Sequence, residues 1–312
     1  MKQPSIDRFN RSLLLTTAEA GDLLDLHAST IKRLCDDDQV PHTTTDGGHR
    51  RIHLADALEA ARDRNTETFL DPFRPYEGHV WSALRMAEDE KKFGRIRSLA
   101  FSWLLLDRSD LVRPLLRLVA RRPSIPYAVF VDEVLRELMR EVGDAWKEGK
   151  LGVGTEHEAT ELVTDCLHGL REEWASQPDP TSVAVVGGLE KNRHDLGPLS
   201  IRLLLERAGW EVIYLGADVP LEEIAEIQIT RGADLVCISV GPTDGRGGAV
   251  RALRLLSLLY RPESPYAIAL GGEELSPKTD SDWIPDPLPF RDVGIFAGAV
   301  EFESWLQGRG DE

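Results

Sequence analysis

The middle of the chain carries apolar residues at the three- and four-residue spacing of amphipathic helices. The spacing is regular over residues 96–106, 111–119 and 131–142, with polar positions between the apolar ones. About four such helices, packed through their apolar faces, form a bundle. The pattern therefore predicts a helical-bundle domain over residues 78–176.

From residue 183 onward the period of the pattern changes. Short runs of apolar residues, which predict strands buried on both faces, alternate with helical stretches. The runs occupy residues 183–186, 212–215, 235–240 and 267–270. This alternation is typical of an α/β, doubly wound (Rossmann-like) parallel sheet, which we expect over residues 182–308. Ligands of such sheets bind beyond the carboxyl ends of the strands.

Residues 1–70 combine short helical segments with turn-forming residues. A capping box at Thr16 and Glu19 predicts the start of one helix, and Ser29 lies at the start of a second. The Asp46-Gly47-Gly48 segment suits a hairpin turn and directly precedes basic residues. Two helices followed by a basic hairpin are the layout of a winged-helix DNA-binding domain. The predicted DNA contacts are Ser29, Thr30, Lys32, Arg33, His49, Arg50 and Arg51.

Composition places this layout in a soluble globular protein. The chain has 312 residues, of which 42% are hydrophobic and 29% charged; at roughly 100–200 residues per domain, it holds two or three domains. No apolar run approaches the ~20 residues of a membrane span, and the first residues lack the core of a signal peptide. The three cysteines lie far apart without a CxxC pair, so we expect a cytoplasmic protein. Linkers are predicted at residues 71–76 and 177–181.

The charge balance limits how the protein can bind nucleic acid. A net charge of −16 argues against non-specific binding by the whole molecule. Even residues 1–70 contain nine lysines and arginines against twelve aspartates and glutamates. We therefore expect one copy to bind DNA weakly and an oligomer to be required.

The N-terminal segment resembles the MerR/excisionase family of winged-helix regulators. Its pattern, T-x-A-E-A-x-x-L-L, S-T-[IV]-[KR]-R and G-G-H-R-R, is matched at Thr17, Glu19, residues 29–33 and residues 47–51. Three positions differ from that pattern: Asp25 stands for the turn glycine, His27 for the helix-capping serine and Leu34 for an aromatic residue. The resemblance implies that the second helix enters the major groove and that the wing arginines contact phosphates.

The loop after the first predicted strand of the sheet resembles the cobalamin-binding signature D/E-x-H-x-x-G. Here the signature has Asn192, His194 and Gly197. The resemblance implies that the His194 imidazole is the lower axial ligand of cobalt, oriented by residue 192. Asn192 replaces a carboxylate, which should make the imidazole a weaker ligand. Later positions of the family are matched by Ser239 and by Gly271-Gly272, while Gly241 replaces a leucine.

The helical segment resembles the adenosylcobalamin-binding bundle of the CarH/LitR-type light-sensing repressors. Trp146 is followed after nine residues by Glu156-His157. A break over residues 150–154 separates them, and a capping box at Thr155 and Glu158 predicts the next helix. The resemblance implies that Trp146 packs on the adenosyl group while Glu156 and His157 flank it. Packing in an ordinary helical core is the alternative for Trp146, one of seven tryptophans.

The family resemblance implies a transcriptional repressor with adenosylcobalamin as cofactor and operator DNA as partner. In the dark the loaded protein would form a homotetramer on DNA, and light would release the adenosyl group and give a smaller species. Where some members have a second histidine ligand this chain has Lys147, so His157, His168 or water remain open for the lit state.

An enzyme is not expected. The sequence holds no G-x-S-x-G, Walker or H-E-x-x-H motif, and a DNA-binding domain does not suit a corrinoid carrier subunit. The alternative reading is a winged-helix regulator whose degenerate corrinoid domain senses another ligand or a protein partner.

Overall fold

The computed structural model describes residues 3–174, 180, 182–275 and 282–309. The predicted linker at residues 177–181 falls outside the described residues apart from Pro180. The chain divides into two compact units, Met1–Ser124 and Ile125–Glu312. We describe each unit by itself. Because this division falls inside residues 78–176, the three predicted domain boundaries stay predictions.

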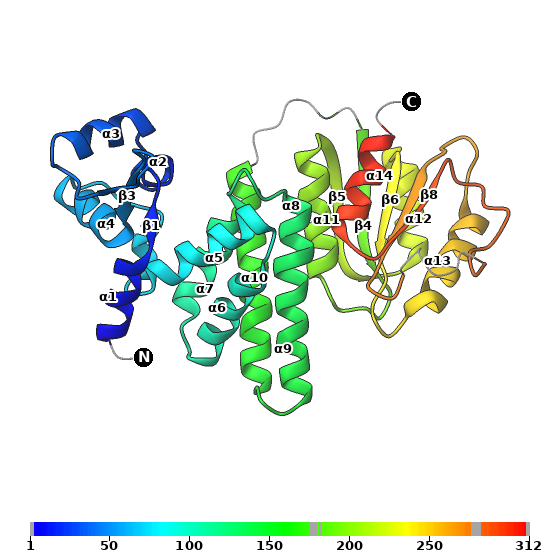
Figure 1. Ribbon diagram of the computed structural model, residues 1–312. Coiled ribbons are helices and arrows are strands. Elements are labelled where there is room, and N and C mark those ends of the chain that lie inside the picture. The colour runs from blue at the N-terminus through cyan, green and yellow to red at the C-terminus, as the bar shows by residue number, and fades with distance from the viewer. Residues whose placement is uncertain (1–2, 175–179, 181, 276–281, 310–312) are drawn as a thin grey trace. The chain divides into compact units, whose positions relative to one another are not determined.

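The first unit begins with helices and a small antiparallel sheet (Figure 1). The order of the three strands is β1-β3-β2, with Leu15 paired to Ile52 and Thr44 to Arg50. The predicted hairpin is therefore confirmed, and Gly48 takes a φ of 77° in its turn. The elements are α1 (Gln3–Ser12), β1 (Leu14–Leu15), α2 (Thr17–Leu24), α3 (Ala28–Asp36), β2 (Thr43–Thr44), β3 (Arg50–His53) and α4 (Leu54–Asp63).

Local side chains fix the ends of α2 and α3. Thr16 and Glu19 form the predicted capping box, in which Glu19 accepts the Thr16 N–H at 2.6 Å. Asp25 ends α2 in the left-handed conformation, at a φ of 52°, so it takes the backbone geometry usually left to glycine. The His27 Nδ1 accepts the Ser29 N–H at 3.3 Å and caps α3. The substitutions Asp25 and His27 thus preserve the turn between the two helices.

The first unit continues through a short 3₁₀ turn, η1 (Asp71–Phe73), into α5 (Glu77–Glu90), α6 (Gly94–Leu105) and α7 (Ser109–Ala120). The helices predicted at 96–106 and 111–119 are confirmed. The segment expected to be a linker at 71–76 is instead packed, because Phe73 is fully buried and stacks on Trp103 with ring centroids 6.1 Å apart. Ion pairs join α2 to later residues of this unit: Arg122 contacts Asp22 at 2.7 Å and Glu88 at 2.6 Å.

The second unit opens with helices that pack on its sheet. They are α8 (Tyr127–Phe130), the π-helical turn η2 (Val131–Arg136), α9 (Glu137–Lys147) and α10 (Val153–Trp174). The helix predicted at 131–142 is confirmed. α10 begins at Val153, so Thr155 and Glu158 lie inside the helix. The prediction of a capping box at Thr155 was therefore wrong. Tyr127 Oη donates to the Ser200 carbonyl at 3.3 Å, and burial raises the pKa of Tyr127.

The sheet of the second unit is parallel, with strand order β5-β4-β6-β7-β8. Its four predicted strands are confirmed, and β8 is an additional one. The strands are β4 (Ser182–Leu189), β5 (Trp210–Val219), β6 (Leu235–Ser239), β7 (Ala267–Gly271) and β8 (Val293–Phe296), and the helices between and after them are α11 (Leu196–Arg207), α12 (Leu221–Arg231), α13 (Gly245–Leu259) and α14 (Ala299–Gly308).

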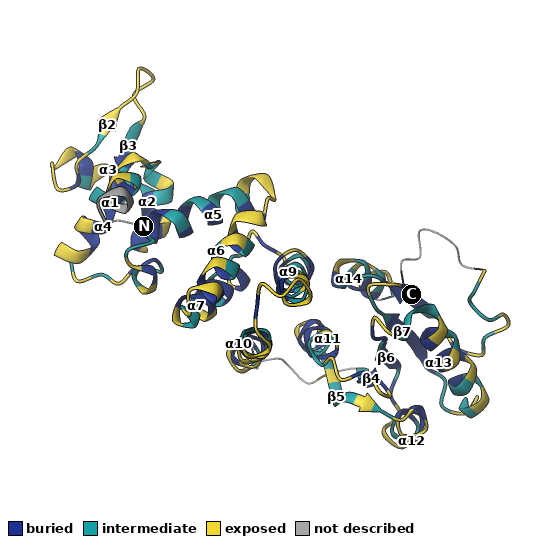
Figure 2. Cartoon of the chain, turned by 90° about the horizontal axis from the view of Figure 1, so that it is seen from below, coloured by how far each residue is buried: buried dark blue, intermediate teal, exposed yellow. Residues whose placement is uncertain are grey.

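Helices cover both faces of this sheet (Figure 2). α11 and α14 lie on one face, and α12 and α13 lie on the other. The core between the layers is apolar, with Val185, Val236, Ile268 and Leu253 fully buried. This is the predicted doubly wound Rossmann-like architecture.

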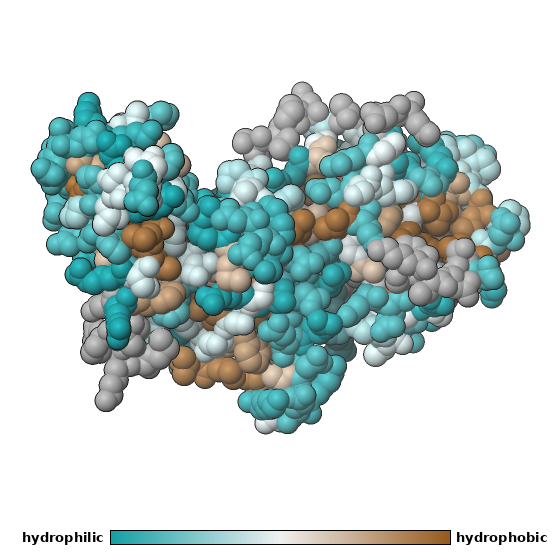
Figure 3. Space-filling model, viewed as in Figure 1, coloured by the Kyte–Doolittle hydropathy of each residue, from teal (hydrophilic) through white to brown (hydrophobic). Residues whose placement is uncertain are grey.

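The surface is mainly hydrophilic in the view of Figure 3, with several hydrophobic patches. Among the described helices, none is long and apolar enough to cross a membrane. Where the structure describes side chains, the exposed large hydrophobic residues are Leu14, Leu105, Leu106, Trp146, Val153, Leu258 and Val300.

Candidate corrinoid site and DNA-binding surface

The sheet of the second unit has its topological switch point between β4 and β6. The chain leaves β4 toward α11 on one face, and it leaves β6 toward α13 on the other face. The two connections diverge at the carboxyl edge, where sheets of this strand order bind ligands. His194 lies on the loop after β4, and Ser239 ends β6 in register with Gly188. The structure therefore brings two of the predicted site segments together.

Hydrogen bonds hold the backbone of the loop that carries His194. Asn192 donates its N–H to the Leu189 carbonyl at 2.9 Å and accepts the Asp218 N–H at 2.9 Å. The Asp218 carboxylate in turn accepts the Lys191 N–H at 2.6 Å. The Asn192 Oδ1 accepts the main-chain N–H of His194 at 3.1 Å. The backbone of residue 194 is thus fixed before any ligand binds.

The His194 side chain is exposed, and no described hydrogen bond reaches its ring. We expected Asn192 to orient the imidazole, whereas its oxygen binds the His194 backbone instead. The next residue, Asp195, accepts a hydrogen bond from Tyr214 Oη at 2.5 Å. Burial and this aspartate raise the pKa of Tyr214, so the phenol remains a donor and fixes Asp195 at the start of α11.

Glycines allow close approaches around the switch point. A Cβ at Gly197 would lie 3.1 Å from the Ser239 Oγ, and one at Gly272 would lie 2.6 Å from the Val240 carbonyl oxygen. Gly271 pairs with Ser239 in the sheet, and a Cβ there would meet nothing within 4 Å. Small residues therefore line the edge between the end of β6, the end of β7 and the start of α11.

Trp146 and the Glu156-His157 pair lie on the two sides of the turn between α9 and α10. Trp146 is the penultimate residue of α9 and is 45% exposed. Glu156 is half-buried in the first turn of α10 and lies 3.4 Å from the exposed His157 ring. In Figure 1 this turn and the loops at the carboxyl ends of the strands lie on the same side of the second unit. A pocket shared by Trp146, Glu156 and His157 stays a prediction.

The predicted DNA contacts lie on α3 and the hairpin of the first unit. Ser29, Lys32 and Arg33 are exposed on α3, and Thr30 is half-buried there. His49 is exposed in the hairpin, where Arg51 is half-buried and donates to the Arg50 carbonyl. Arg50, expected to contact phosphate, forms an ion pair with Asp36 at the end of α3.

Sequence reasoning missed a buried carboxylate that joins the helices of the second unit to the last helix of its sheet. Asp132 in the π-helical turn is 7% exposed and accepts the N–H groups of Ala299 at 2.9 Å and Val300 at 3.0 Å. Arg136 lies 3.3 Å from this carboxylate and donates to the Ala297 carbonyl at 2.9 Å. The four-residue spacing of Asp132 and Arg136 signals a helical ion pair, but nothing local indicates the contact with α14.

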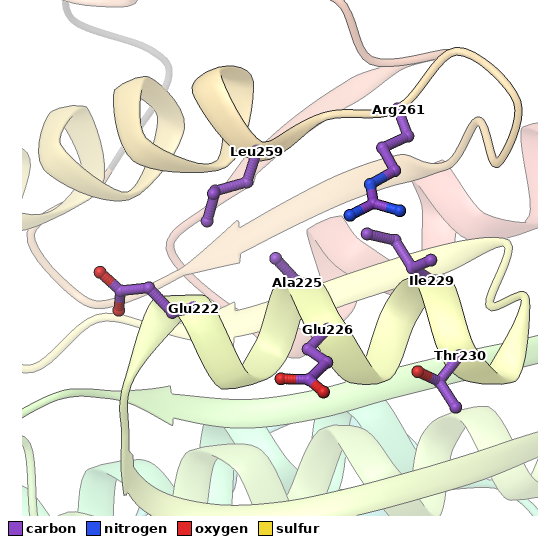
Figure 4. Close-up of a pocket in the computed structure, with 7 residues that line it drawn as sticks. All are labelled: Glu222, Ala225, Glu226, Ile229, Thr230, Leu259 and Arg261. Carbon is purple, nitrogen blue, oxygen red and sulfur yellow. The ribbon is translucent and has the colours of Figure 1, made fainter.

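A separate pocket lies between α12 and the end of α13 (Figure 4). Its lining contains none of the predicted site residues. The lining residues are Glu222, Ala225, Glu226, Ile229, Thr230, Leu259 and Arg261. Among the described residues there is no group of three or more His, Cys, Asp or Glu that would hold a metal ion.

The residues at the switch point fit a corrinoid. An exposed imidazole on a fixed backbone is a suitable nitrogen ligand, and the exposed Gly197 presents no side chain to a ligand at the start of α11. The buried Asn192 also keeps one polar atom, Nδ2, without a partner among the described residues. This donor set suits a ligand rich in oxygen acceptors that approaches His194.

Three family models match the chain. A helix-turn-helix domain model matches residues 14–64, and two models described as B12 binding domain match residues 103–170 and 182–282. The HTH-type transcriptional repressor CarH of Myxococcus xanthus is 29% identical over 116 residues, which are 37% of this chain and 38% of that protein. In domain composition the chain is CarH-like.

Corrinoid proteins that are not named as repressors are also similar to parts of the chain. Dimethylamine corrinoid protein 3 of Methanosarcina acetivorans is 28% identical over 136 residues, which are 43% of this chain and 64% of that protein. The chain thus spans less than two thirds of the length of these curated relatives. The solved monomethylamine corrinoid protein of Methanosarcina barkeri superposes with a TM-score of 0.53 at 17% identity, covering 69% of this chain and 99% of that chain. This last likeness shows the fold of a corrinoid-binding protein.

Proposed function

We propose that this protein is a transcriptional repressor whose assembly and DNA binding are controlled by bound adenosylcobalamin, with light as the signal. The observation that carries the proposal is the His194 loop at the switch point of the sheet, in a chain that also has a helix-turn-helix domain. A ligand-binding module and a DNA-binding module in one chain are the two parts that a ligand-controlled regulator needs.

The residues at the corrinoid site would take distinct parts. The His194 imidazole would ligate cobalt, with its backbone held by Asn192. Gly197, Ser239, Gly271 and Gly272 would line the path of the nucleotide tail. When bound, adenosylcobalamin would supply a cobalt–carbon bond that light cleaves. The exposed Trp146 ring would pack on the adenosyl group, with Glu156 and His157 beside it.

Assembly would strengthen DNA binding. Residues 1–70 are net acidic, and the hairpin residue Arg50 is already paired with Asp36. One copy of this DNA-binding segment therefore has few basic side chains to contact phosphate. When several copies are held in one assembly, binding of one DNA-binding segment raises the effective concentration of the others near the DNA. A cofactor that stabilises the assembled state therefore raises DNA affinity without a new contact at the DNA.

The test compares the loaded protein in the dark and after green light by size-exclusion chromatography and DNA retention. We expect a larger species that retains DNA in the dark and a smaller one that releases it after illumination. Trp146→Ala should lose the dark assembly while still binding cobalamin. Leu258→Ala, which changes another exposed large hydrophobic residue (83% exposed), is the matched control and should behave as the wild type. Identical sizes and DNA binding in dark and light would refute control by light.

A second candidate is a winged-helix regulator whose corrinoid domain responds to another ligand or to a protein partner. It is favoured by Asn192, which places no negative charge next to His194 and binds its backbone instead of its ring. Failure of any cobalamin to bind the purified protein would support this candidate.

A corrinoid carrier of a methyl-transfer system is a further reading, because dimethylamine corrinoid proteins match part of the chain. The helix-turn-helix match over residues 14–64 favours a regulator. Specific retention of one DNA sequence would distinguish the two.

A further inference from the structure

The side chain of Asn192 is buried, and one of its two polar atoms has no hydrogen-bond partner among the described residues. The residue is 4% exposed. Its Oδ1 accepts the His194 main-chain N–H at 3.1 Å, whereas its Nδ2 has no partner among the residues that the structure describes. Because a buried donor without an acceptor is unfavourable, an unused amide N–H here calls for a partner that arrives with a ligand.

Gly241 makes this placement of Asn192 possible. A Cβ at residue 241 would lie 2.8 Å from the Asn192 Cγ, 2.9 Å from its Oδ1 and 3.2 Å from its Nδ2. The Asn192 amide therefore occupies the space that any side chain at residue 241 would need. Asn192 lies after β4 and Gly241 just after β6, so the unused donor lies between the two segments that diverge at the switch point.

We propose that Asn192 is a direct contact of the bound corrinoid, donating its free Nδ2–H to a ligand oxygen, and that Gly241 is the positioning residue that admits it. This inference rests on the proposed corrinoid binding. The acceptor is an oxygen without a proton, either an amide carbonyl on the corrin ring or a phosphate oxygen in the nucleotide tail. Residue 192 then acts on the ligand and on the His194 backbone, and it does not act through the imidazole ring.

Asn192→Asp distinguishes a direct contact of residue 192 with the ligand from an action of residue 192 through the imidazole ring, because the two predict opposite changes in affinity. The aspartate keeps an oxygen for the His194 N–H but replaces the Nδ2 donor with a negative oxygen that repels a ligand oxygen. We expect affinity for adenosylcobalamin, titrated by absorbance in the dark, to fall about tenfold. The absorption spectrum of the bound cofactor should remain that of the wild type, because His194 still ligates cobalt. If residue 192 instead orients the ring, the carboxylate would tighten binding and change the spectrum.

Asn65→Asp is the matched control. It makes the same chemical change at an exposed turn residue of the first unit, and we expect no change in affinity. The same titrations with cobinamide, which lacks the nucleotide tail, locate the acceptor. If Asn192→Asp also weakens the binding of cobinamide, the acceptor lies on the corrin ring. If it weakens the binding of adenosylcobalamin alone, the acceptor lies in the nucleotide tail.

Gly241→Ala tests the positioning step. We expect it to weaken binding about tenfold in the wild-type background and to cost nothing further in the Asn192→Ala background, where the colliding amide is gone. Equal losses in both backgrounds, or an Asn192→Asp variant that binds as tightly as the wild type or more tightly, would overturn the inference. A wild type that binds no cobalamin would refute the proposed function itself.

Discussion

Replacing Asp132 by alanine removes the carboxylate that caps α14 from a neighbouring helix. The two oxygens of Asp132 accept the N–H groups of Ala299 and Val300, which have no partner within their own helix. The N-cap residue, Gly298, provides no side chain for this purpose. The variant therefore leaves two orphan donors at the start of α14 and removes the ion-pair partner of Arg136.

The magnitude follows from these contacts. Loss of a helix N-cap costs about 0.5–2 kcal/mol, and the pair with the partly exposed Arg136 adds about 0.2–1 kcal/mol. Together Asp132→Ala should lower the free energy of unfolding of the second unit by about 2 kcal/mol. At about 3 °C per kcal/mol for a unit of this size, its Tm should fall by about 6 °C.

The assay combines thermal unfolding of the full-length chain with hydrogen–deuterium exchange, which reports the N–H groups of residues 299 and 300 directly. The control is Arg140→Ala, which removes an exposed ion pair with Glu137 and should change stability by less than about 0.5 kcal/mol.

Gly298→Ala supplies an independent test of the same contact. A Cβ at Gly298 would lie 2.6 Å from the Asp132 Oδ2, so this variant should destabilise the wild type more than the Asp132→Ala protein. Unchanged protection of residues 299 and 300 in Asp132→Ala, or equal costs of Gly298→Ala in both backgrounds, would refute this reasoning.

Three other variants test the first unit. Asp36→Asn should release Arg50 for phosphate, so binding to duplex DNA should tighten and the slope of log affinity against log salt should steepen by about 0.9; an unchanged slope would contradict it. Burial and, secondarily, Arg95 lower the pKa of His79, so this residue contributes stability above its ordinary pKa that is lost as pH falls through the lowered one. His79→Gln should therefore lose less Tm than the wild type between pH 7.5 and pH 5.5, and an equal loss would argue against this. Asp25→Gly should raise stability by up to about 1 kcal/mol, because Asp25 has a φ of 52°; a lower Tm would show that its side chain matters more.

Local patterns were sufficient for the regular elements and insufficient where distant residues decide. The strands and helices with clear periodicity formed as predicted. β8 has only four residues, Val293–Phe296, and follows a proline-rich stretch, so no periodic signal marks it. Prolines near Phe73 suggested a linker, yet stacking on Trp103 buries that ring. Thr155, three residues before Glu158, also suggested a capping box at the start of a helix, but α10 starts earlier, at Val153.

Some features of the candidate site were likewise predictable from the sequence, and others were not. Because carboxyl ends of parallel strands share one edge, the sequence alone placed His194, Ser239 and Gly271 together. The contacts of Asn192 were not predictable, since they depend on the missing side chain of Gly241, which belongs to another strand connection.

The assignment of His194 as the cobalt ligand carries the proposed function most directly. The measurement is the absorption spectrum of the full-length protein after mixing with adenosylcobalamin in darkness and desalting, for the wild type and for His194→Ala. We expect cobalamin to co-elute with the wild type with a spectrum distinct from that of the free cofactor, and to be lost or spectrally altered in His194→Ala. Equal affinity and identical spectra for the two proteins would contradict the assignment of His194.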